Sequence, residues 1–273
     1  MSDQYRVFGN PVAHSKSPEI HRLFADDCAQ EMDYDKHLVA IGEFDAEAIK
    51  FFDAGGKGLN VTVPFKEEAY RFAQELTPRA RAAGAVNTLL IQKEGVILGD
   101  NTDGAGLVWD LVERLGWSLT GRRILVLGAG GAARGVVLPL LAAAPSQIVI
   151  ANRTVQKAQH LVATFDSPSL SACGYPDLAE ETRFDLIINA SSASLAGEVP
   201  ALPEESYAAS TRVYDMVYGK APTAFLRWAD GAGMVARSDG LGMLVGQAAE
   251  SFYLWRGVRP DAARVLQYLR ENL

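Results

Sequence analysis

The sequence predicts an α/β protein with two domains. Apolar runs of strand-like composition alternate with segments of helical period along the whole chain, without an internal repeat or a low-complexity segment. The 273 residues, 48% of them hydrophobic, are enough for two medium-sized domains that each bury a core. A glycine-rich turn between an apolar strand and a helix, within residues 122–135, predicts that the second domain is doubly wound.

The first part of the chain alternates short apolar runs with amphipathic segments. We expect strands at Tyr5–Gly9, Tyr34–Ala40 and Gly58–Val63, and helices at Pro18–Ala29, Asp45–Asp53, Pro64–Ala73, Thr77–Ala83 and Gly104–Leu115. A Lys-Glu-Gly turn predicts that Val86–Gln92 and Gly95–Gly99 pair as strands. We place the first domain boundary near residue 102.

The second part is typical of a doubly wound series of strands and helices. Expected strands are Arg123–Leu127, 147–151, 184–190 and 211–217, and a buried helix covers Gly135–Pro145. Two amphipathic helices follow, one after Ser238 and one from Pro260 to Leu273. The pattern alone lets these last helices pack on either domain.

Composition excludes several classes of function. A net charge of -7 and a pI of about 5.2 argue against a nucleic-acid-binding surface, which needs clustered Lys and Arg. The start of the chain has no apolar segment of a secretory signal, and Gly135–Pro145 is too short for a membrane span. The histidines lack zinc-site spacing, so we expect no metal. Cys28 and Cys173 are far apart, which favours free thiols and a cytoplasmic location.

A dinucleotide site is predicted where Gly128, Gly130 and Ala133 form G-x-G-x-x-A after an apolar strand and at the start of a helix. Gly128 permits the tight turn, Gly130 lets the backbone approach a pyrophosphate, and Ala133 keeps helix and sheet close. The amides at the start of the helix would bind phosphate oxygens. An ordinary glycine-rich turn is the alternative, but the strand before and the helix after favour cofactor binding.

The end of the next strand indicates which dinucleotide is bound. Enzymes that use NAD usually carry Asp or Glu here for the ribose hydroxyl, whereas this chain has Asn152, Arg153 and Thr154. Arg153 offers a planar cation for a 2′-phosphate and for stacking on adenine, with Lys157 as a second cation. The sequence therefore predicts NADP rather than NAD, the alternative being that Arg153 is a solvated surface residue.

Polar residues of the first part suggest a second site, although each has a structural alternative. Ser15 and Ser17 precede Pro18, so one serine could cap a helix. The period of a strand puts Asn60 and Thr62 on one face, which mere solvation at a sheet edge would also explain. Three further polar residues occupy loops or helix starts, where Asp most often acts as a cap: Lys66, Asn87 and Asp103.

Taken together, these segments resemble the shikimate dehydrogenase family. The matching segments are GNPVAHSKSP, GLNVTVPFK, GAVNT, GDNTDG, GAGGAARG, NRT and GMLVGQAA, in an order and spacing that extend over nearly the whole chain. The resemblance implies a substrate-binding α/β domain of residues 1–102 plus 240–273 and a Rossmann-like NADP domain of residues 103–239. It also implies an active site in the cleft between them and reversible NADPH-dependent reduction of 3-dehydroshikimate to shikimate, a step of chorismate and aromatic amino acid biosynthesis.

The resemblance also assigns roles to residues of this chain. Lys66 and Asp103 are implied to be the catalytic pair. The substrate would contact Ser15, Ser17, Asn60, Thr62, Lys66, Asn87, Asp103, Tyr218 and Gln247, with the two serines holding its carboxylate. The cofactor would contact Gly128, Ala129, Gly130, Gly131, Ala132, Asn152, Arg153, Thr154, Lys157, Ser191, Met216 and Gly240. A small-molecule substrate and a monomer or homodimer are expected.

Two positions depart from the usual family pattern. Pro78 stands where a glutamate is common, which puts one cofactor-side contact in doubt. NASSASL at 189–195 replaces the more frequent NATSAGL, but Ser191 keeps a hydroxyl where threonine is common. Two other functions stay open: a dual quinate/shikimate dehydrogenase, and a regulatory NADP-binding module without catalysis.

The expected chemistry gives Lys66 a role at the substrate carbonyl. Reduction of a ketone needs a hydride on carbon and a proton on oxygen, and a cationic lysine beside the carbonyl can polarise it and donate that proton. An ionised Asp103 would bind a substrate hydroxyl and orient Lys66. From the sequence alone, Lys66 is either the proton carrier or mainly an electrostatic anchor.

Overall fold

The computed structural model describes residues 2–181 and 183–273, which fold into two compact units. One unit runs to Gly106 and includes Leu244–Asn272, and the other comprises Leu107–Met243 with Leu273. Both boundaries lie inside helices, α5 (Asp103–Trp109) and α9 (Leu241–Arg256), whereas the sequence placed them near 102 and 240. A helix carries no mark in its composition where its contacts change from one core to another, so the sequence could not locate these points.

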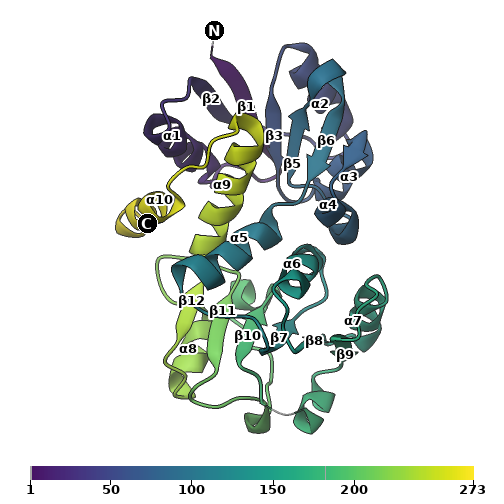
Figure 1. The fold of residues 1–273 in the computed structure, drawn as a ribbon, viewed down its shortest axis with the longest axis vertical. Coiled ribbons are helices and arrows are strands. Elements are labelled where there is room, and N and C mark those ends of the chain that lie inside the picture. The colour runs from purple at the N-terminus through teal and green to yellow at the C-terminus, as the bar shows by residue number, and fades with distance from the viewer. Residues whose placement is uncertain (1, 182) are drawn as a thin grey trace. The chain divides into compact units, whose positions relative to one another are not determined.

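The first unit is built on a six-stranded mixed sheet of order β2-β1-β3-β5-β6-β4 (Figure 1). Strands β1 (Asp3–Gly9), β2 (Met32–Leu38) and β3 (Gly58–Val61) are parallel, β5 (Thr88–Ile91) is antiparallel to both β3 and β6 (Ile97–Asp100), and β4 (Glu75–Leu76) is parallel to β6. The predicted pairing around the Lys-Glu-Gly turn is thus confirmed as the β5–β6 hairpin.

Aromatic side chains form much of the core beneath this sheet. Phe8 of β1 packs edge-on against Phe44, the rings 6.1 Å apart, and Phe44 stacks on Phe65 at 5.7 Å. All three rings are fully buried, and such contacts add to the area that they remove from water. Helices of this unit are α1 (Ser17–Asp27), α2 (Phe44–Asp53), α3 (Lys66–Phe72), α4 (Pro78–Ala83), most of α9, and α10 (Ala262–Glu271).

The second unit is a doubly wound domain with an all-parallel sheet of order β12-β11-β10-β7-β8-β9 (Figure 1). This order reverses at β7, the switch point at which such folds bind dinucleotides. The strands are β7 (Arg123–Leu127), β8 (Gln147–Ala151), β9 (Leu170–Cys173), β10 (Leu186–Asn189), β11 (Arg212–Asp215) and β12 (Arg237–Asp239). The helices are α6 (Gly131–Ala142), α7 (Val155–Val162) and α8 (Ala224–Gly231).

Several expected elements differ in detail. The expected helix Gly104–Leu115 is α5 followed by a π-helical turn at Asp110–Arg114. The expected helix Pro64–Ala73 begins only at Lys66, which places that lysine in the first turn of α3. Within the described residues, no helix is long and apolar enough to cross a membrane, and no group of three or more acidic, His or Cys side chains could hold a metal ion.

Candidate active site

A polar cluster in the first unit gathers residues that lie far apart in the sequence. Lys66 begins α3, Asn87 directly precedes β5, and Asp103 begins α5 just beyond β6. Lys66 Nζ lies 2.6 Å from Asp103 Oδ2, and Asn87 Nδ2 donates to Asp103 Oδ1 at 2.8 Å. The Asp103 carboxylate is therefore held from both sides, by one charged and one neutral donor.

The Lys66–Asp103 ion pair remains accessible. The side chain of Lys66 is 30% exposed and that of Asp103 is 15% exposed, so both functional groups can reach a bound molecule while most of the pair is withdrawn from water. Partial withdrawal strengthens the attraction between the two charges relative to a fully solvated pair. A cation beside a carboxylate, open on one side, can polarise a carbonyl and transfer a proton.

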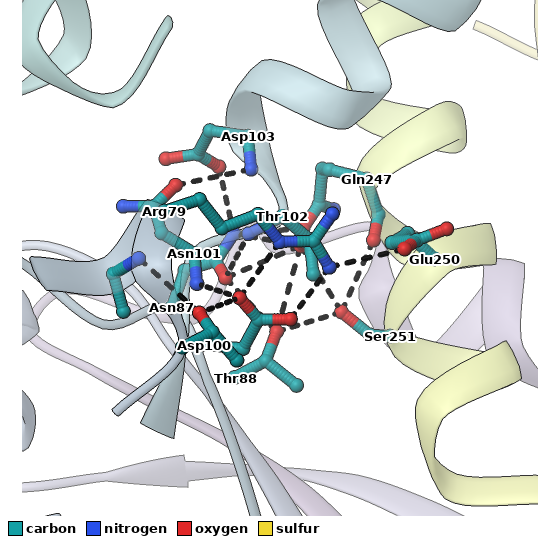
Figure 2. Close-up of polar contacts among 12 residues, drawn as sticks. Arg79, Asn87, Thr88, Asp100, Asn101, Thr102, Asp103, Gln247, Glu250 and Ser251 are labelled. Carbon is teal, nitrogen blue, oxygen red and sulfur yellow. Dashed lines mark hydrogen bonds and ion pairs between the residues drawn. The ribbon is translucent and has the colours of Figure 1, made fainter. Parts of the chain in front are cut away.

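The orientation of the Asn87 amide is fixed by its neighbours (Figure 2). Its Oδ1 accepts a hydrogen bond from the Thr102 backbone N–H at 2.9 Å, and an N–H group can only donate. Its Nδ2 faces the Asp103 carboxylate, which accepts. Gln247 Oε1 of α9 lies 3.3 Å from the same nitrogen, so the structure brings Gln247 to this cluster as well.

Asn60 lies behind the cluster, with its hydrogen-bonding groups committed to other residues. Its Oδ1 accepts from Tyr34 Oη at 2.7 Å and lies 3.2 Å from His21 Nε2. Its Nδ2 donates to the Asn87 carbonyl oxygen at 3.1 Å and has Thr88 and Ser251 hydroxyls within 3.2 Å. The sequence grouped Asn60 with the substrate contacts, but in this structure its amide joins parts of the protein.

The two serines lie at the start of α1. Ser17 is the first residue of the helix and Lys16 occupies the cap position without a side-chain cap, so the alternative that Ser17 is the cap is wrong. Ser15 Oγ accepts from the Ser17 backbone N–H at 3.3 Å, and the Ser17 hydroxyl bonds the Tyr34 phenol, whose pKa is raised by burial. Thr62 follows β3, and its N–H donates to the Phe8 carbonyl.

The glycine-rich turn of the second unit has the backbone that a phosphate needs. Gly128 has φ +106°, and a Cβ there would lie 3.2 Å from the Ala190 backbone, so only glycine fits without strain. A Cβ on Gly130 or Gly131 would meet nothing within 4 Å, which leaves the backbone open to an approaching ligand. Helix α6 starts here without a side-chain cap. Its first amides, among them those of Ala132 and Ala133, can therefore bind an anion.

Two cations lie near this turn, beyond β8. Arg153 and Lys157 are exposed, and within the described chain neither side chain has a hydrogen bond or an ion pair. Asn152 Nδ2 donates to the Thr154 carbonyl at 2.9 Å, which shapes the loop that presents Arg153. Tyr175 is close enough to Arg153 for its charge to lower the pKa of the phenol, although burial outweighs this effect and raises it.

The remaining expected cofactor residues follow three neighbouring strands of the sheet, Ser191 after β10, Met216 after β11 and Gly240 after β12. A Cβ on Gly240 would lie 2.1 Å from the Met216 carbonyl oxygen, so glycine is required for this close approach of two chain segments. Ser191 Oγ donates to Asn189 Oδ1 at 2.7 Å, which uses its proton within the protein. Tyr218 also belongs to this unit, beyond the end of β11.

Several structural residues of both sites were missed by the sequence analysis. They are buried or half-buried partners of the expected residues and of one another: His21, Tyr34, Arg79, Thr88, Asp100, Thr102, Asn189, Asp215 and Ser251. One signal was available, because Asp100, Asn189 and Asp215 are polar residues at the ends of apolar strands, where a doubly wound or mixed sheet gathers its functional loops.

Segments of both units match families of known proteins. Residues 7–89 match the shikimate dehydrogenase substrate binding domain, residues 110–199 match shikimate / quinate 5-dehydrogenase, and residues 240–270 match the shikimate 5'-dehydrogenase C-terminal domain. A relative from Saccharophagus degradans, shikimate dehydrogenase (NADP(+)), is 51% identical over 99% of both chains.

Solved structures give the same result. An Ael1 enzyme from Pseudomonas putida is 45% identical, with a TM-score of 0.93 over 98% of both chains. Shikimate 5-dehydrogenase from Thermus thermophilus, solved in complex with NADP(H) and shikimate, is 34% identical, with a TM-score of 0.87 over 99% of this chain and 100% of that one.

Proposed function

The chain belongs to the shikimate dehydrogenase family, and we propose that it catalyses the reversible NADPH-dependent reduction of 3-dehydroshikimate to shikimate. The observation that carries this proposal is the accessible Lys66–Asp103 ion pair, 2.6 Å long, with Asn87 fixed beside it. Its relatives are named NADP-dependent enzymes, and the second unit has exposed cations where such a cofactor carries its extra phosphate.

When bound, NADPH would supply the hydride that adds to the carbonyl carbon. Lys66 binds the carbonyl oxygen, stabilises the negative charge that develops on it and donates a proton from its ammonium group. Asp103 orients that ammonium through the ion pair and accepts a hydrogen bond from a neighbouring substrate hydroxyl. In the reverse direction Lys66 takes the proton back from the hydroxyl that is oxidised.

The other expected contacts with the substrate are hydrogen bonds of neutral groups. Ser15 and Ser17 would bind the carboxylate, and Thr62, Asn87, Tyr218 and Gln247 would complete the substrate pocket. Asn60 supports them, because its amide already bonds Tyr34 and the Asn87 carbonyl. These assignments rest on the motifs of the sequence and, for Asn87 and Gln247, on the contacts that bring them to Asp103.

The cofactor is assigned to the second unit. The turn Gly128–Ala132 would bind the pyrophosphate, with the amides at the start of α6. Arg153 and Lys157 would bind the 2′-phosphate, with Asn152 and Thr154 shaping their loop. Ser191, Met216 and Gly240 would lie near the nicotinamide, which the close approach of Gly240 to the Met216 carbonyl supports.

The domain roles follow from the same assignments: residues 1–102 plus 240–273 bind the substrate and residues 103–239 bind NADP. Because Cys28 and Cys173 are both free, we also propose a cytoplasmic location. We also propose that the protein is a monomer or a homodimer, that it acts on a small molecule, and that it has no nucleic-acid partner.

Quinate is a second candidate substrate, because the model matched by residues 110–199 describes both shikimate and quinate 5-dehydrogenases. The experiment that separates them crosses shikimate and quinate with NADP and NAD while the absorbance of reduced nicotinamide is followed. We expect the shikimate–NADP pair to give the highest kcat/KM. Higher kcat/KM with quinate would reassign the substrate, and absence of turnover in all four pairs would favour the regulatory module.

A further inference from the structure

Asp100, at the end of β6, is a buried carboxylate that accepts four hydrogen bonds (Figure 2). Arg79 donates to it twice, from Nε at 2.7 Å and from Nη2 at 2.5 Å. Thr77 Oγ1 donates at 2.5 Å and the Asn101 backbone N–H at 2.7 Å. Three of these hydrogen bonds converge on Oδ1 and one goes to Oδ2, so the side chain of Asp100 is fixed.

These donors tie Asp100 to the start of α4 and to the residue that follows it in the chain, and Arg79 extends the network to α9. Thr77 is the N-cap of α4, where it also accepts from the Ala80 N–H at 3.2 Å. Arg79 Nη2 reaches a second carboxylate, Glu250 on α9, at 3.0 Å. Glu250 lies about one helical turn beyond Gln247 on the same helix, so Arg79 also fixes the segment that carries Gln247.

The network continues from Asp100 to Asp103 through Asn101. The backbone N–H of Asn101 is held by Asp100, and its side-chain Oδ1 accepts from the Asp103 N–H at 3.2 Å. The Asn101 Nδ2 donates to the Ala85 carbonyl at 3.1 Å, in the loop that leads to Asn87. Asn101 therefore sets the position of Asp103 relative to Asn87.

We propose that Arg79 and Asp100 are positioning residues for Asp103, an inference that rests on the catalytic role proposed for Asp103 above. Neither residue belongs to the pair that touches the substrate. Arg79 holds Asp100, Asp100 fixes the Asn101 backbone, and Asn101 fixes the first residue of α5. Arg79 also binds Glu250 on α9, so one guanidinium fixes the positions of both Asp103 and Gln247.

If Arg79 and Asp100 only stabilised the fold, replacing both of them would leave the activity of the folded protein unchanged. A buried ion pair contributes little net stability compared with an apolar pair of similar size, because desolvation offsets the attraction. An apolar pair, however, cannot accept the Asn101 N–H or the Thr77 hydroxyl. Replacing both charges with apolar side chains therefore separates the two roles: it removes the positioning bonds without leaving one buried charge unpaired.

The test compares three variants of the full chain. Arg79→Lys keeps the charge but loses the planar two-point contact. The double variant Arg79→Met/Asp100→Leu removes both charges. Arg259→Met is the matched control, because Arg259 binds the other oxygen of Glu250 at 3.0 Å but its side chain is 64% exposed. Circular dichroism and NADP affinity establish that each variant is folded.

We expect kcat/KM for shikimate to fall about 10-fold in Arg79→Lys and about 100-fold in the double variant, the range for a small misplacement of a catalytic group. NADP affinity stays constant in both, and Arg259→Met stays within about twofold of the wild type. Wild-type kcat/KM in the double variant overturns the proposal. If that variant does not fold, Arg79→Lys decides alone, and an unchanged value overturns it.

A second measurement distinguishes positioning from general damage. In an Asp103→Asn background, the Arg79→Lys change should lower kcat/KM by less than about twofold further, because the two residues act on the same group. Losses that multiply independently would contradict the proposal. A wild-type enzyme without shikimate turnover would refute the proposed function, whereas normal turnover that is insensitive to Arg79→Lys would refute only this inference.

Discussion

Acid should destabilise this protein through one buried histidine, His21. The ring is fully buried and stacks on Tyr34, with centroids 4.3 Å apart and planes at 11°. Its Nε2 faces the Asn60 amide oxygen, and within the described residues its Nδ1 has no hydrogen-bond partner. Protonation would place an unpaired N–H and a positive charge in this site, and burial lowers the pKa of His21 from 6.5 to about 3.

The size of the effect follows from the difference between folded and unfolded pKa values. Between pH 6.5 and about 3 the unfolded chain binds a proton at His21 that the folded chain does not bind. The free energy of unfolding therefore falls as the pH falls through this window, by about 1.4 kcal/mol per pH unit and by about 5 kcal/mol in total. At pH 5 the loss from His21 alone is about 2 kcal/mol.

The assay is urea unfolding at several pH values between 7 and 4, for the wild type and for His21→Phe. Phenylalanine keeps an aromatic ring among Phe24, Phe252 and Trp255 but cannot titrate. We expect its free energy of unfolding to depend on pH less steeply than that of the wild type, by about 1.4 kcal/mol per pH unit. His160→Asn, at an exposed position, should keep the wild-type slope. Equal slopes for the wild type and His21→Phe would refute the reasoning.

Three further predictions concern activity. Lys66→Ala should lower kcat by about 10²- to 10⁴-fold with little change in KM, as expected for loss of a positioned acid, in steady-state assays of a variant that still binds NADP. Full turnover would remove Lys66 from the catalytic role. Arg153→Ala should weaken NADP by about 1.5 to 3 kcal/mol and NAD far less in titrations, and equal losses would disprove the 2′-phosphate contact. Ser15→Ala with Ser17→Ala should raise KM for shikimate at constant NADP affinity, and an unchanged KM would place the carboxylate elsewhere.

The sequence predicted the long elements of the fold and missed the short ones. Strands β7, β8, β10 and β11 are apolar runs between turns, and all four were expected. Strands β4, β9 and β12 were missed, because Glu75–Leu76 is too short for any period and Arg237–Asp239 is polar. Such edge strands form because a neighbour offers unpaired backbone groups, which a local pattern does not reveal.

In the candidate active site, too, the sequence predicted some residues and missed others. Lys66, Asn87 and Asp103 lie in recognisable segments, and the structure brings them together as expected. Arg79 carries no such mark, since an arginine in a short helix resembles any surface residue. Its partner Glu250 is 171 positions away, so only the folded chain reveals the contact. Pro78, the departure from the family pattern, is accommodated as the first residue of α4 after its Thr77 cap.

A second buried carboxylate, Asp215 at the end of β11, explains why aspartate rather than asparagine occupies such positions. It accepts from Asn189 Nδ2 at 3.1 Å, the Val217 N–H at 3.1 Å, Ser194 Oγ at 2.6 Å and Thr223 Oγ1 at 2.5 Å. Burial raises its pKa, and the four hydrogen bonds oppose that shift. An asparagine would have an NH2 group in place of one oxygen, so two of these four groups would lose their acceptor. The Ser194 and Thr223 hydroxyls could turn to accept from that NH2 group, but the Asn189 and Val217 N–H groups could not, so asparagine would fit in one orientation only and with weaker, uncharged hydrogen bonds. A carboxylate can accept from all four groups at once, and both Asp100 and Asp215 hold several loop segments at the end of a strand in this way.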